Sequence, residues 1–137
     1  ITRTFESKKQ KGAEVDLSTV FANSVKKAVR TVILDQKDHL EVIDRLETRD
    51  KEATVSWIMV TPAEAKITGK NRIELTKDGQ RMLLTADTGT EVEMKIWSNV
   101  PPHEYDFRNP GTIRVGFETV IPANRASQLK VRLIPLK

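Results

Sequence analysis

The chain has 137 residues, of which 38% are hydrophobic and 31% charged, and it contains no cysteine. This composition is typical of one soluble globular domain with a single core, and it excludes disulfides and thiolate metal sites. The net charge of +4 comes from 23 basic and 19 acidic residues that are interleaved along the chain, whereas nucleic-acid binders concentrate basic residues in one stripe. We therefore predict one domain over residues 1–137 with a charged, solvated surface and no nucleic-acid partner, while a polyanionic ligand stays open.

The sequence shows neither a membrane-spanning run nor a signal peptide. No apolar run approaches the ~20 residues that cross a bilayer, and the first residues, ITRTFESKKQ, lack the apolar core of a signal peptide. We expect no membrane insertion. Because the chain starts at Ile1 rather than at methionine, we expect it to be a processed product or part of a longer protein.

The first thirty residues predict a short strand and a loop, and then a segment whose pattern fits either a helix or a strand. Residues 1–5 form a possible short strand, and residues 6–12 are polar enough for an exposed loop. Leu17, Phe21, Val25 and Ala28 then follow at near-helical spacing, although residues 25–34 also read as a β-branched strand. We predict a short helical turn followed by a strand.

Residues 29–61 predict three consecutive strands arranged as a meander. Residues 29–34 are β-branched and apolar, residues 35–38 form a polar turn, and residues 39–46 alternate so that Leu40, Val42, Asp44 and Leu46 share one face. After a charged connection, Val55, Trp57 and Met59 point one way and their neighbours the other. Pro62 ends this strand because proline has no amide hydrogen to donate.

Regular turn signals continue to the end of the chain and indicate an all-β fold. Polar turns at residues 68–71 and 77–80 bracket the run 72–76, residues 91–97 alternate strictly, and residues 112–121 and 129–133 supply two last strands. We predict an antiparallel β-sandwich of two sheets with hairpin connections and at most a short helical turn near the N-terminus, with a barrel as the alternative closure. The predicted core consists of Val42, Leu46, Val55, Trp57, Met59, Ile73, Leu75, Leu84, Val92, Met94, Ile96, Val115 and Phe117.

Sequence motifs for catalysis or for cofactors are scarce. The two histidines, His39 and His103, lack the close His, Asp and Glu spacing of a metal site. The glycines sit singly at turns or in a strand, so no phosphate-binding loop is present. We expect no metal, no cofactor and no nucleotide.

The proline-rich loop 99–111, NVPPHEYDFRNPG, is where contacts with a ligand are expected. Its substrate-binding candidates are His103, Tyr105 and Arg108, with Arg114 next in sequence and Trp97 as an aromatic platform on the polar face of its strand. Acid/base catalysis by His103 and Tyr105 is disfavoured, because residues this close in a loop project in different directions. Three hypotheses stay open: a structural domain, a binding module and an independent enzyme.

The order of features resembles the C-terminal all-β region of the heparinase II/III-like polysaccharide lyases. The resemblance covers nearly the whole chain and is carried by common strand and turn residues in a particular order. The stretches that carry it are Val15-Asp16-Leu17 ahead of Arg30-Thr31-Val32, residues 40–46, residues 57–62, and Tyr105-Asp106 followed by Asn109-Pro110-Gly111.

This resemblance implies a bacterial exported enzyme, periplasmic or extracellular, in which an α-helical toroid precedes a β-sheet region. Such an enzyme cleaves uronic-acid-containing polysaccharides by β-elimination. The family's catalytic tyrosine and histidine lie in the toroid and in a histidine- and aspartate-containing motif that has no match here, so no catalytic residue is carried over. The expected partners are the N-terminal catalytic domains of the same parent chain and an acidic polysaccharide.

Overall fold

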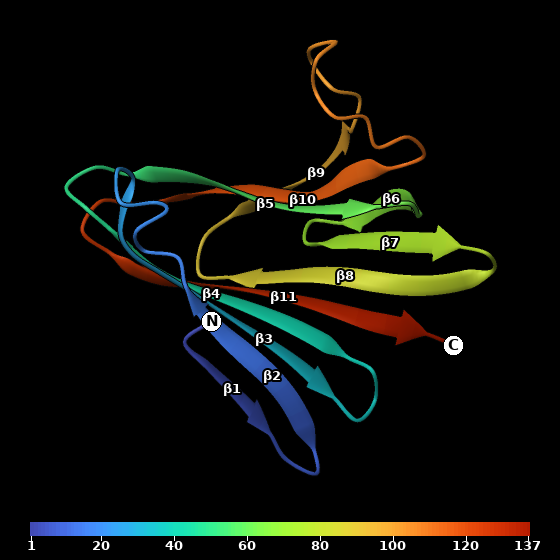
Figure 1. Ribbon diagram of the computed structural model, residues 1–137, viewed down its shortest axis with the longest axis horizontal. Helices are drawn as coiled ribbons and strands as arrows, with labels where there is room; N and C mark the ends of the chain where they lie inside the picture. Colours follow the sequence, from blue (N-terminus) through green and yellow to red (C-terminus); the bar gives the residue numbers. More distant parts are fainter.

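The structure, a computed structural model, describes residues 1–137 and contains eleven strands and no helix. Two antiparallel sheets face each other, which confirms the predicted all-β sandwich with hairpin connections (Figure 1). No helix capable of crossing a membrane is found. The strands are β1 (Arg3–Glu6), β2 (Gln10–Asp16), β3 (Val25–Asp35), β4 (Leu40–Thr48), β5 (Ala53–Thr61), β6 (Glu64–Gly69), β7 (Arg72–Lys77), β8 (Gln80–Thr88), β9 (Val92–Ser98), β10 (Ile113–Ile121) and β11 (Ala126–Leu136).

The two sheets differ greatly in size. The large sheet has eight strands in the order β1-β2-β3-β4-β11-β8-β7-β6, and the small sheet has three in the order β5-β10-β9. The small sheet packs over the β4, β11, β8 and β7 part of the large sheet, where the core lies. Strands β1, β2 and β3, which we call the wing, fan away from the small sheet (Figure 1).

Most of the predicted core is confirmed, with one error and several omissions. Ile96 is 39% exposed, because it lies near the end of β9, the edge strand of the small sheet. The alternating residues of β11, Leu129, Val131 and Leu133, are buried but were not in the predicted set. The confirmed buried residues are Val42, Trp57, Ile73, Leu75, Leu84, Met94, Val115 and Phe117, and Leu46, Val55, Met59 and Val92 pack against them half-buried.

The predicted meander over residues 29–61 is wrong at its third strand. β3 pairs with β4 as expected, but β5 pairs with β10 in the small sheet, with Trp57 opposite Phe117. Alternation identifies the buried face of a strand and not its neighbour. The charged connection 49–52 carries the chain from one sheet to the other.

The N-terminal third also contains more strand than the sequence indicated. β2 occupies part of the predicted loop, and β3 begins at Val25, so the alternative reading of residues 25–34 as strand holds. Leu17 to Ser24 form turns, in which the amides of Val20 and Phe21 donate to the carbonyl of Leu17. The short strand β6 was not predicted either, because its six residues are mostly exposed.

Gly116 allows the central strand β10 to pack closely against β5. A Cβ at this position would lie 1.8 Å from the carbonyl oxygen of Trp57 and 3.3 Å from its Cε3 atom. Only glycine leaves room for this approach. Trp57 and Phe117 stack in the core directly beside it, with ring centroids 6.1 Å apart.

Candidate functional site

The connection between β9 and β10 is a loop that stands out from the end of the small sheet (Figure 1). Pro101, Pro102 and Pro110 restrict its backbone. Its base is closed by hydrogen bonds, because the Asn99 amide donates to Thr112 Oγ1 at 2.7 Å and the Thr112 hydroxyl donates to the Asn109 carbonyl at 2.6 Å. The loop therefore has a defined shape although it has little contact with the core.

His103 and Tyr105, two of the predicted binding residues, come together near the tip of this loop. The amide of Asp106 donates to the carbonyl of His103 at 3.1 Å, and the amide of His103 donates to Asp106 Oδ2 at 3.2 Å. This turn stacks the two rings at a centroid distance of 5.0 Å and an interplanar angle of 5°. Tyr105 is 84% and Phe107 100% exposed, so the tip presents aromatic faces to solvent.

Arg108 lies in a hollow of about 410 Å³ formed by the same loop. His103 and Asn109 also line it, and Glu104 contributes a carboxylate. An arginine with aromatic neighbours is a common arrangement for contacts with the carboxylate or sulfate of an acidic sugar. His103 and Arg108 thus share the lining of this hollow, and Tyr105 is stacked on His103.

Trp97 and Arg114 form a separate pair on the outer face of the small sheet. They are direct partners in the β9–β10 ladder. The Arg114 guanidinium donates from Nε and Nη2 to the Ser98 carbonyl at 3.1 and 3.0 Å, so part of its hydrogen-bonding capacity is used inside the protein. Trp97 is half-buried, which leaves less free ring surface than the predicted platform requires.

The geometry of the loop suits binding better than catalysis. The expectation that His103 and Tyr105 project in different directions is wrong, because their rings stack. No hydrogen bond, however, orients either side chain as an acid or a base. No group of three or more His, Cys, Asp or Glu side chains is placed to hold a metal ion. The loop offers flat aromatic surface and one guanidinium.

A second polar site, which the sequence interpretation missed, lies between the two sheets. Arg30 on β3 donates from Nε and Nη2 to the two carboxylate oxygens of Asp44 on β4 at 2.7 and 2.8 Å. The hydrogen bonds with Asp44 raise the pKa of Arg30 against the opposing effect of burial. This ion pair lines a cavity of about 260 Å³ with Leu17, Phe21 and β5 residues that include Trp57.

Trp57 adds an unsatisfied donor in this region, because its Nε1 is buried without a hydrogen-bond partner. Cε3 of the indole lies on the Gly116 side, and Nε1 is on the opposite edge of the ring. The N–H group is therefore directed away from β10. The sequence signal for this site is Asp44, a charged residue on the same strand face as the apolar residues Leu40, Val42 and Leu46.

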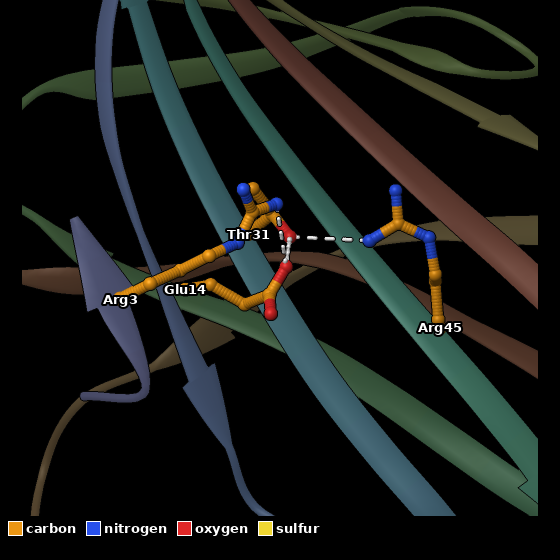
Figure 2. A network of polar contacts seen from close by, with 4 residues as sticks. All are labelled: Arg3, Glu14, Thr31 and Arg45. Carbon is orange, nitrogen blue, oxygen red and sulfur yellow. Dashed lines mark hydrogen bonds and ion pairs between the residues drawn. The ribbon is translucent and has the colours of Figure 1, made fainter. Parts of the chain in front are cut away.

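A third polar cluster lies on the outer face of the large sheet (Figure 2). Arg3 and the Thr31 hydroxyl each donate to Glu14 Oε2 at 3.2 Å, and Arg45 donates to Thr31 Oγ1 at 3.1 Å. The hydrogen bond from Arg3 lowers the pKa of Glu14 below its ordinary value of 4.5. These contacts tie β1 to β4 and need no ligand to explain them.

Comparison with solved structures gives consistent matches to one group of enzymes. A heparinase III structure superposes with a TM-score of 0.71 at 12% identity, covering 98% of this chain and 20% of its own. A second heparinase III gives 0.68 at 13% identity, covering 99% and 21%. A heparan sulfate lyase from Pedobacter heparinus gives 0.64 at 16% identity, covering 98% and 21%.

These matches establish a shared fold. The chain spans about a fifth of the length of the lyases that it matches. No protein-family model matches the sequence, and no curated protein is detectably similar to it.

Proposed function

We propose that this chain is a non-catalytic β-sandwich domain of a larger polysaccharide lyase, which cleaves heparan sulfate or a related uronic-acid-containing polysaccharide by β-elimination. The observation that carries the proposal is the match over 98% of this chain but only 20% of heparinase III. In this role the sandwich packs against the catalytic domains and completes their fold.

The amount of exposed surface supports an incomplete unit. The chain exposes 9407 Å², whereas a compact monomer of 15.5 kDa exposes about 7,200 Å². The projecting loop accounts for part of the excess and the wing for another part. A surplus of this order is comparable to one side of a permanent interface between domains.

The proposal assigns the chemistry to other parts of the larger protein. In the loop no hydrogen bond orients His103 or Tyr105 as a base, and the inter-sheet cavity is lined by neither a tyrosine nor a histidine. We therefore expect residues 1–137 alone to form no unsaturated uronate from heparan sulfate. The measurement is ultraviolet absorbance of that product, with His103→Ala and Tyr105→Phe as companions; steady product that either variant abolishes would place an active site in the loop.

A second candidate function, binding of acidic polysaccharide, rests on the stacked His103–Tyr105 pair beside Arg108. Exposed charge contacts contribute only ~0–1 kcal/mol each, so binding to heparan sulfate oligosaccharides should be about millimolar and should fade with added salt. Arg108→Ala should weaken it and Arg114→Ala should not, because Arg114 is engaged with the Ser98 carbonyl. Equal titration curves for wild type and Arg108→Ala would remove this function.

A further inference from the structure

β5 is an edge strand without the usual protection against pairing. It has β10 on one side and no neighbour on the other. Its nine residues, ATVSWIMVT, contain no charge, proline or glycine, and its ladder with β10 runs without a bulge from Ala53 to Thr61. Proteins commonly protect such edges with charged residues, prolines, bulges or very short strands.

The other three edges of the two sheets show these protective features. β9, the opposite edge of the small sheet, carries Glu93 and Lys95. β1 has four residues with a charge at each end, and β6 has two charged residues and a register shift after Ile67. β5 differs from all of them, which indicates that its free backbone groups are paired in the functional protein.

The wing of the large sheet has an inner face that the small sheet does not cover. Along one row of inward-facing partners, Val131 is 0% and Val42 8% exposed, and Val32 on β3 is only half-buried. In the next row Leu84 is fully buried, while Leu34 is half-buried. Burial therefore declines toward the wing, where Val15, Val32 and Leu34 share the inner face with Lys11 and Arg30.

The open edge and the uncovered face adjoin each other. The cavity of about 260 Å³ is lined by β5 residues on one side and by Ala28, Arg30 and Asp44 of β3 and β4 on the other, and Leu17, Phe21 and Ser24 of the turn segment line one end of it. A strand added to the free edge of β5 would continue the small sheet across this cavity and over β3. A single added segment would then pair with the free edge of β5 and cover the inner face of the wing.

We propose that β5 is paired with a β-strand from another segment of the larger protein, and that this strand and its neighbours cover the wing. The inference rests on the proposed function, because the matched lyases contain about five times as much chain. At a strand spacing of about 4.8 Å, roughly two or three added strands would span the wing.

The uncovered face of the wing also determines which side chains the added strand must carry. Its inward side chains must be apolar to pack on Val15, Val32 and Leu34, and they alternate with polar ones on the outside. Backbone pairing supplies affinity, and the apolar alternation supplies register.

Hydrogen–deuterium exchange on the complete gene product and on residues 1–137 alone tests this inference. Amides of β5 that face away from β10 should exchange at least about tenfold more slowly in the complete product. The β9 edge and the central strand β10 serve as controls and should exchange alike in both. Equal exchange of β5 in the two proteins would overturn the inference, as would a complete product that contains no further residues.

A matched pair of variants in β3 tests whether the added strand lies over the wing. Leu34 faces inward and Ile33 outward, and both are half-buried. Leu34→Asp should remove most of the protection of β5 in the complete product, and Ile33→Asp should leave it; Leu34→Ser takes its place if the first variant does not fold. Equal effects of both substitutions would contradict the proposed location.

Two further outcomes separate this inference from its alternatives. Protection of β5 that rises with the concentration of the isolated chain would assign the edge to a second copy and overturn the proposal. Lyase activity is read separately: an active complete product with an unprotected β5 refutes only the strand addition. A protected β5 in an inactive product refutes only the proposed function.

Discussion

Substituting Gly116 by alanine tests whether close contact between β5 and β10 holds the small sheet together. The new Cβ would lie 1.8 Å from the Trp57 carbonyl oxygen and 2.9 Å from its carbonyl carbon. Both are backbone atoms in the middle of an uninterrupted ladder, so no flexible side chain can move aside. The strands must separate locally, and Trp57 and Phe117 must shift with them.

The expected cost combines overpacking with weakened hydrogen bonds. Overpacking a well-packed core costs typically about 1–3 kcal/mol, and each disturbed ladder bond adds about 1 kcal/mol. Gly116→Ala should therefore lower the free energy of unfolding by about 3 kcal/mol or more. For a chain of this length that corresponds to a fall in Tm of roughly 10 °C.

Urea unfolding followed by tryptophan fluorescence measures this effect, because Trp57 is at the contact itself. Gly89→Ala is the matched control, since a Cβ there would meet nothing within 4 Å, and its effect should stay within about 0.5 kcal/mol. An unfolding midpoint for Gly116→Ala equal to that of Gly89→Ala would refute the close packing of β5 on β10.

Four further substitutions probe the core, the buried ion pair and the outer network. Trp57→Ala should cost about 3–5 kcal/mol in urea unfolding, because Trp57 is 6% exposed; a loss below about 1 kcal/mol would contradict its central place in the core. Asp44→Asn should cost about 1–3 kcal/mol, less than for a fully buried pair because the Arg30 side chain is 38% exposed, and Arg30→Lys should not preserve the bidentate contact. Glu14→Gln should flatten the acid side of the stability profile: Arg3 lowers the pKa of Glu14 in the folded state, so its contribution is present above about pH 4.5 and is lost as the pH falls through the folded pKa. Parallel acid profiles for wild type and Glu14→Gln would contradict this pKa shift.

The sequence was informative about strands and faces because alternation is a local property. Val55, Trp57 and Met59 on β5 and Val92 and Met94 on β9 were assigned to the inner face correctly. The pairing of β5 with β10 and of β4 with β11 could not be read in the same way. These ladders join segments far apart in the chain, and each alternating strand fits many partners.

The candidate binding residues show a similar division between local and long-range information. The sequence identified the loop, but the stack of His103 on Tyr105 depends on a backbone turn held by Asp106. The Arg30–Asp44 pair was within reach of sequence reasoning. Asp44 shares an apolar face, a buried carboxylate needs a partner, and the turn at residues 36–38 sets the register that places Arg30 opposite it.

The proposed role of the chain within a larger lyase is tested most directly by deleting it. The complete gene product and the same product without residues 1–137 are compared for formation of unsaturated uronate from heparan sulfate and for Tm. The account predicts steady product from the complete protein, and loss of both activity and thermal stability when these residues are removed. Undiminished activity and Tm in the truncated protein, or no product from the complete one, would contradict it.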